Sequence, residues 1–196
     1  MKQQRTTGRT TKLLLVDAAV LLRAATFAAD KHRHQRRKDA DASPYINHPL
    51  AVACLLAVEA NVQDEALLAA ALLHDTVEDT EATLLELEET FGPTVRGIVE
   101  EVTDDKSLPK KERKALQVNH APHASVAARQ LKIADKICNI RDIADCPPAD
   151  WSKSRKVEYL SWTEDVVRGC RGANATLDAV YDQAIKKARR KLGIEA

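Results

Sequence analysis

The sequence predicts an all-α fold, on three observations. Apolar residues recur at the three- and four-residue spacing of a helix in almost every segment. Proline, glycine and helix-capping residues separate these segments. No pair of alternating polar and apolar segments gives a convincing strand hairpin. With 196 residues, of which 44% are hydrophobic, the chain is long enough to bury one core. We expect a single compact bundle of about eight to ten helices.

The chain divides into a short tail and one domain. Residues 1–14 are basic and rich in threonine, which predicts a flexible tail, and residues 15–196 are expected to form the domain. The 30 Lys and Arg side chains nearly balance the 29 Asp and Glu side chains, so the net charge of +1 favours neither nucleic acid nor an anionic membrane. No apolar run is long enough to cross a membrane, and no obligate protein partner is evident.

The four cysteines lack the paired spacing of a zinc site or a redox-active disulfide. We therefore expect reduced, buried thiols in a cytoplasmic protein. Residues 1–16 lack acidic side chains, as organellar transit signals do, but no apolar segment typical of a secretion signal is present.

The first helix is predicted over residues 15–37. Its apolar positions, which recur at helical spacing, are Ala18, Leu21, Leu22, Ala25, Phe27 and Ala28. The helix ends in a dense basic run that includes His32, Arg37 and Lys38. Such a run is either a solvated helix end, where cations interact favourably with the C-terminal dipole, or a local anion-binding patch.

A loop at residues 39–44 leads through Tyr45 to a second predicted helix, residues 50–59. Pro49 suits the first turn of this helix, because the amide hydrogen that proline lacks would have no partner there. The proline also restrains the backbone of His48. His48 is therefore either a simple cap or a metal ligand that points inward from a rigid position.

The strongest functional signal is where an apolar central helix, predicted to run unbroken to about residue 79, ends in two polar pairs. These pairs are His74 with Asp75 and Glu78 with Asp79. Because the pairs are four residues apart, about one turn of helix, their side chains can face one small volume. Buried carboxylates and imidazoles need a partner, and a divalent cation is a simple one. The alternative is a solvated helix end.

The rest of the chain is predicted to form further helices between Pro and Gly breaks. They are expected at residues 84–91, 95–102, 125–144, 158–169 and 175–192, with a charged connection at 103–114 and a partly helical segment at 117–123. In the long helix at 125–144, Asp135 is flanked by apolar residues. It therefore binds a metal or pairs with Lys132, Lys136 or Arg141. Asn139 follows Asp135 by one turn and faces the same volume.

Four segments, in this order, resemble the motifs of one enzyme family. They are His32-Arg33-His34-Gln35-Arg36-Arg37-Lys38, Tyr45-Ile46-Asn47-His48-Pro49, His74-Asp75-Thr76-Val77-Glu78-Asp79-Thr80 and Ile133-Ala134-Asp135-Lys136-Ile137-Cys138-Asn139-Ile140-Arg141. On these motifs the chain resembles the HD-domain phosphohydrolases, in particular the alarmone hydrolases of the RelA/SpoT group. Residues 102–106 and 117–122 look most similar to the small stand-alone hydrolases called metazoan SpoT homologues. His34 and Ile133 depart from the Gly and Leu common in the long enzymes, and no nucleotide-transferring domain is expected.

The resemblance implies a metal-dependent hydrolase of the alarmones of the stringent response. Its expected reaction removes the 3′-pyrophosphate from guanosine 3′,5′-bis(diphosphate), ppGpp, or from pppGpp, leaving GDP or GTP. The implied ligands of one manganese ion are His48, His74, Asp75 and Asp135, a mixed nitrogen and oxygen set that suits manganese or iron. Glu78 and Asp79 are expected to act on the attacking water as base and orienter. The expected substrate-binding residues are His32, Arg37, Lys38, Tyr45 and Asn139.

Two other functions stay open. The same metal site could act on another nucleotide, notably on the 2′-phosphate of NADPH. A non-catalytic domain that only binds alarmone would require loss of a metal ligand, of Glu78 or of Asp79, and all of these are present.

Overall fold

The computed structural model describes residues 16–194, and the all-α prediction is confirmed. The α-helices in chain order are α1 (Ala18–Lys31), α2 (Asn47–Cys54), α3 (Glu65–Leu73), α4 (Thr76–Asp79), α5 (Leu84–Phe91), α6 (Pro93–Val102), α7 (Lys110–His120), α8 (Val126–Asp145), α9 (Lys153–Cys170) and α10 (Ala175–Lys191). A π-helical segment, η1 (Leu55–Glu59), follows α2, and a short 3₁₀ turn, η2 (Ala121–His123), follows α7. Residues 16–194 contain no strand, only an isolated bridge between Arg36 and Pro44. The tail predicted at residues 1–14 lies outside the described residues.

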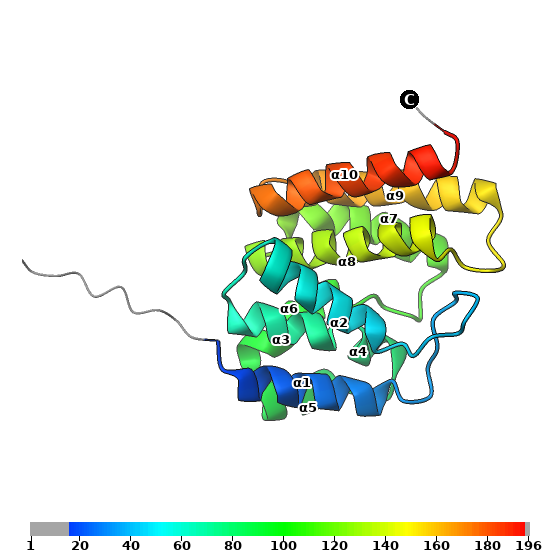
Figure 1. Ribbon diagram of the computed structural model, residues 1–196. Coiled ribbons are helices and arrows are strands. Elements are labelled where there is room, and N and C mark those ends of the chain that lie inside the picture. Colours follow the sequence, from blue (N-terminus) through cyan, green and yellow to red (C-terminus); the bar gives the residue numbers. More distant parts are fainter. Residues whose placement is uncertain (1–15, 195–196) are drawn as a thin grey trace, which may run out of the picture.

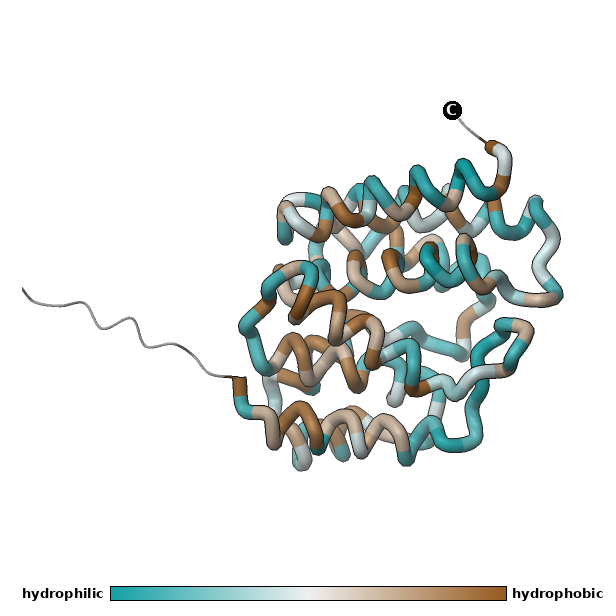
Figure 2. The backbone as a smooth tube through the Cα atoms, viewed as in Figure 1, coloured by the Kyte–Doolittle hydropathy of each residue, from teal (hydrophilic) through white to brown (hydrophobic). Residues whose placement is uncertain are grey.

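The helices are stacked in layers (Figure 1). Helices α1 and α5 form one outer side, α2, α3 and α6 lie next to them, α7 and α8 follow, and α9 with α10 form the opposite outer side. Helix α3 contacts α1, α2, α6 and α8. Every side chain from Leu67 to Leu73 is buried, which explains why this segment is apolar on all faces. Figure 2 shows that hydrophobic residues are concentrated on α3, whereas many residues of α10 and of the loops are hydrophilic.

Side-chain caps fix the starts of several helices. Asp64, Thr83 and Ser125 accept hydrogen bonds from backbone amides in the first turns of α3, α5 and α8. These bonds satisfy amides that have no carbonyl partner within the helix. Helix α8 therefore begins where the sequence predicts, and it carries Asp135 into the interior.

Helices α7 and α9 begin at least five residues before their predicted starts. Helix α7 begins at Lys110, within the segment predicted to be a connection. None of its side chains is fully buried, so its sequence has no clear apolar stripe to indicate a helix. Helix α9 begins at Lys153 rather than at Glu158, because the Ser152 hydroxyl caps it by accepting from the Arg155 amide.

The helix predicted at residues 50–59 has two parts. Helix α2 begins earlier, at Asn47, and its regular hydrogen bonding ends at Cys54. The next turn is π-helical and is closed by a 3.0 Å hydrogen bond from the Ala60 amide to the Leu55 carbonyl. His48 and Pro49 lie in the first turn of α2, as expected, and both are buried.

The cysteine prediction is correct in part. All four cysteines are free thiols, and Cys138 and Cys170 are buried, whereas Cys54 and Cys146 are exposed. None of the helices within residues 16–194 is long and apolar enough to cross a membrane.

Candidate active site

The central helix is interrupted at His74 and Asp75, so the prediction of an unbroken helix is wrong there. The His74 Nδ1 lies 2.8 Å from the Ala71 carbonyl oxygen, and the Thr76 hydroxyl donates to the Leu73 carbonyl at 2.6 Å. Both carbonyls would otherwise accept from amides one turn later in the helix. Because side chains take over these carbonyls, α3 ends at Leu73 and α4 begins at Thr76.

His48, His74 and Asp135 come together from α2, the end of α3 and α8. Each offers one possible ligand atom, and these atoms all lie within 4.8 Å of one another. The Nε2 atoms of His48 and His74 lie 3.1 Å and 3.9 Å from Asp135 Oδ1.

The Ala71 carbonyl determines which ring nitrogen of His74 carries a hydrogen. Its Nδ1 faces a carbonyl, which can only accept, so Nδ1 carries the hydrogen. In the neutral imidazole, the Nε2 atom is then a lone-pair donor, and it is buried without a hydrogen-bond partner. An unpaired buried lone pair beside a second imidazole and a carboxylate fits a divalent cation. These three residues could hold such an ion.

Asp75 also approaches both imidazoles. Its Oδ2 lies 3.2 Å from His74 Nε2 and 3.7 Å from His48 Nε2. The same oxygen accepts a 2.7 Å hydrogen bond from the Tyr45 hydroxyl. Burial raises the pKa of the Tyr45 phenol, so the hydroxyl stays protonated and keeps donating. Tyr45 thus orients Asp75 toward the two histidines.

Asp135 is ionised because of its polar neighbours. Burial opposes the charged form, but the Lys136 ammonium and the His48 contact hold the pKa of Asp135 well below its usual range. Lys136 Nζ donates to Oδ2 at 2.8 Å, and Asn139 Nδ2 donates to Oδ1 at 2.6 Å. The sequence left three cations open as partners for Asp135. Lys136 forms an ion pair with it, whereas Arg141 pairs with Glu59.

Glu78 and Asp79 face different surroundings. Glu78 accepts from the Asp104 amide at 3.2 Å, and burial raises its pKa to about 7. Asp79 accepts from Gln35 at 3.0 Å and from Lys106. Burial opposes its charge, but these two contacts lower its pKa overall. Glu78 is therefore the carboxyl group that can exchange a proton near neutral pH.

Two cavities meet at this site. The inner cavity, about 160 Å³, is lined by His74, Asp75, Glu78, Gln117, Lys132, Asp135 and Lys136, among others. The outer cavity, about 660 Å³, is lined by Gln35, Lys38, Asp79, Asp142, Trp151 and Tyr159, among others. The residues common to both are Arg37, Tyr45, His48 and Asn139. The shared residues form the border between the two cavities.

The expected substrate-binding residues lie at different depths. Arg37 donates to Asp142 at 2.5 Å and to Asn139 at 3.2 Å, and its guanidinium lies over the Tyr45 ring, 5.5 Å from the centroid. Lys38 is exposed at the outer cavity. His32 lines neither cavity. It is 2% exposed and packs against Tyr45, with ring centroids 4.8 Å apart.

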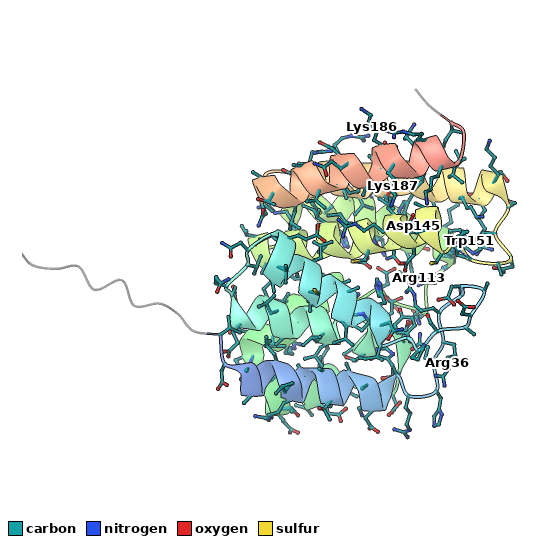
Figure 3. The ribbon with its side chains drawn as sticks, viewed as in Figure 1. Arg36, Arg113, Asp145, Trp151, Lys186 and Lys187 are labelled. Atoms are coloured by element: carbon teal, nitrogen blue, oxygen red, sulfur yellow. The ribbon has the colours of Figure 1, made fainter. Side chains whose placement is uncertain are left out.

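Sequence reasoning assigned no role to several residues around the cavities. Gln35 stands inside a quoted motif and bonds Asp79, and Asp142 follows Asn139 by three residues on the same helix face. The motif context could have indicated Gln35, and the helical spacing could have indicated Asp142. Trp151 lies in a loop between helices, and its position follows only from the packing; Figure 3 shows it on the same side of the molecule as Arg36 and Arg113.

The chain is similar to known proteins over most of its length. A family model described as an HD domain matches residues 24–160. A guanosine-3′,5′-bis(diphosphate) 3′-pyrophosphohydrolase of Xenopus tropicalis is 57% identical over 166 residues, which cover 85% of this chain and 93% of the relative. The protein of the same name from Homo sapiens is 54% identical over 171 residues, 87% of this chain and 96% of the relative.

A solved structure is similar over almost the whole chain. It is described as a metazoan orthologue of SpoT that hydrolyses ppGpp. It has a TM-score of 0.84 and 45% sequence identity, and the match covers 91% of this chain and 98% of that one. A Listeria monocytogenes structure is more distant, with a TM-score of 0.62, 27% identity and coverage of 74% of this chain.

Proposed function

Because this chain belongs to the HD domain family, we infer that it is a metal-dependent phosphohydrolase. It hydrolyses the 3′-pyrophosphate of ppGpp, the reaction for which relatives 46% to 57% identical to it are named. The observation that carries this conclusion is the convergence of His48, His74 and Asp135 in a chain so similar to those enzymes. The RelA/SpoT resemblance is thereby confirmed, and we extend the proposal to pppGpp.

We propose that the ion is Mn²⁺ and that Asp75 completes a ligand set with His48, His74 and Asp135. A ligand set of two imidazoles and two carboxylates suits manganese or iron better than it suits an ion that prefers thiolates. A bound ion would stabilise phosphoryl charge and make hydroxide available near neutral pH. Tyr45, Lys136 and Asn139 orient the two carboxylates through the hydrogen bonds described above.

In the hydrolysis, a water oxygen bonds to the phosphorus attached to ribose O3′, and the bond between that phosphorus and O3′ breaks. One proton of the water ends on O3′, which gives GDP and pyrophosphate. Glu78 is the proposed proton acceptor, because it lines the inner cavity and has a pKa of about 7. Asp79 is proposed to orient the water, either directly or through Gln35, whose side-chain amide donates a hydrogen bond to Asp79.

The nucleoside is proposed to occupy the outer cavity. Its volume of about 660 Å³ lies within the usual range for small-molecule sites, and Trp151 and Tyr159 offer aromatic surfaces for a base. Arg37 and Lys38 would neutralise substrate phosphates at its edge. Tyr45 and Asn139, at the border of the cavities, would contact the sugar or the reacting phosphate. A direct contact from His32 stays a prediction, because that side chain lies beneath Tyr45.

One assay tests the function against its alternatives. Purified protein with Mn²⁺ is offered ppGpp and NADPH in parallel, and pyrophosphate and orthophosphate are measured separately. We expect pyrophosphate from ppGpp at the higher rate. Faster release of orthophosphate from NADPH would favour the 2′-phosphatase, and alarmone binding without turnover would favour a binding module. A cytoplasmic location, where thiols stay reduced, is proposed with this function.

A further inference from the structure

The inner cavity contains a cation that the reaction above does not use. Lys132, on α8, is 6% exposed and lines this cavity together with His74, Glu78 and Asp135. Within residues 16–194, its ammonium group makes no hydrogen bond or ion pair. A buried charge without a partner is costly, and proteins normally pair such groups.

Lys136, one turn further along α8, shows how a lysine at this depth is normally satisfied. Its Nζ donates to Asp135 Oδ2 at 2.8 Å and lies over the Trp162 ring, 4.7 Å from the centroid. Lys132 has neither contact. Burial, followed by repulsion from Lys136, lowers the pKa of Lys132. An anion in the inner cavity would relieve both effects, because it would pair with the ammonium and offset the like charge.

The size of the inner cavity limits which anion can enter. About 160 Å³ is below the volume of a site for a whole nucleotide, whereas a phosphate group attached to a nucleotide in the outer cavity could reach it past the shared border. Arg37 and Lys38 both line the outer cavity, and Arg37 is already held by Asp142. Lys38 is therefore outside the inner cavity, and Arg37, which lines both cavities, is already engaged at their border.

We propose that Lys132 binds the outer phosphate of the substrate's 3′-diphosphate and thereby selects a diphosphate over a single phosphate. The inference rests on the proposed function, because it assumes that the inner phosphorus reacts beside His48, His74 and Asp135. The diphosphate would then extend across the metal-binding group, with its nucleoside in the outer cavity and its outer phosphate at Lys132. Arg37 and Lys38 are left to contact the remaining phosphates.

The test compares pyrophosphate with orthophosphate as inhibitors of Lys132→Met, at constant free Mn²⁺. Methionine keeps an unbranched side chain in the buried position and removes the ammonium group, with its charge and its hydrogen-bond donors. We expect the inhibition constant of pyrophosphate to rise by about tenfold or more, as expected for loss of a charge-assisted hydrogen bond, and that of orthophosphate to change much less. The melting temperature of the metal-free variant should be equal or higher, since an unpaired buried charge has been removed.

Two control variants and one binding measurement complete the test. Lys186→Met removes an exposed cation of α10, which projects away from the bundle in Figure 3, and should change neither inhibitor. Lys132→Gln, which keeps a polar group, should weaken inhibition by pyrophosphate as Lys132→Met does. Unchanged pyrophosphate inhibition in both Lys132 variants would overturn the proposal, and so would a lower melting temperature with equal losses for both inhibitors. If wild-type protein fails to hydrolyse ppGpp, calorimetry of pyrophosphate binding to the Mn²⁺-loaded proteins still decides the role of Lys132.

Discussion

Three acidic side chains at the site, Asp135, Asp79 and Glu78, have different neighbours, and these neighbours set their charge. Asp135 bonds Lys136, and Asp79 bonds Lys106, so the pKa of each is lowered despite burial. Glu78 has Arg113 3.5 Å away, but burial and nearby carboxylates outweigh that cation and raise its pKa to about 7. The three carboxyl groups are therefore suited to different tasks: two remain charged, and one exchanges a proton.

Replacing Asp135 by alanine should abolish both metal binding and turnover. The change removes an anionic ligand and leaves Lys136 without its carboxylate partner. Metal content of the purified variant, measured together with ppGpp hydrolysis, checks this. Full activity in a metal-loaded Asp135→Ala protein would place the reaction at another site.

Glu78→Gln should retain the metal and reduce the rate by about a hundredfold or more, if Glu78 accepts the proton. Below its pKa, Glu78 is protonated and cannot accept, so the wild-type rate should rise with pH through that pKa. A nearby cation lowers a carboxyl pKa, so this rise should occur at or below about pH 7 in the metal-loaded enzyme. The residual rate of Glu78→Gln should lack this rise, and a pH–rate profile identical to the wild type would instead assign the proton to Asp79.

At the scale of the helices, the break between α3 and α4 positions the site. Without it, the amides of the following turn would take the Ala71 and Leu73 carbonyls that His74 and Thr76 now occupy. The sequence predicted the apolar helix and its polar end correctly, because both depend on spacing along one helix. The break could not be predicted, because it depends on competition between side chains and amides for the same carbonyls. Helix α7 was missed for another reason, since it lacks an apolar stripe.

Thr76→Val tests this break. Thr76 is fully buried, and losing its hydrogen bond to the Leu73 carbonyl should lower the free energy of unfolding by about 1 to 3 kcal/mol. Metal affinity should fall as well, because His74 and Asp75 immediately precede this residue. Thr83→Ala is the matched control: it removes the cap of α5 and should cost about 1 kcal/mol without changing metal affinity. Equal metal affinity in both variants would show that the break does not hold the ligands in place.

At the scale of the whole molecule, the site joins two neighbouring layers of the stack. Its proposed metal ligands come from α2, from the end of α3 and from α8. The motif spacings predicted which residues meet, and the structure brings His48, His74 and Asp135 together. Lys132 and Trp151 could not be assigned in this way, because their places depend on how separate helices pack and not on spacing along one of them.

Metal should stabilise the fold, because ligands from separate helices meet only in the native state. At a free ion concentration 100 times the dissociation constant, the gain is about 2.7 kcal/mol. Melting curves with Mn²⁺ and after chelation measure it. Asp135→Ala should show no such difference, and an unchanged wild-type melting temperature after chelation would count against a metal held by all three helices.

The distance along the chain between the proposed metal ligands has a consequence for synthesis. Asp135 lies 87 residues after His48, so a ribosome has finished α2 and α3 well before α8 exists. The two histidines of the nascent chain therefore lack the Asp135 carboxylate until the later half of the chain emerges and α8 packs against them. Metal uptake then becomes a late event in maturation, and a chain stalled before α8 would be released without a complete site for the ion.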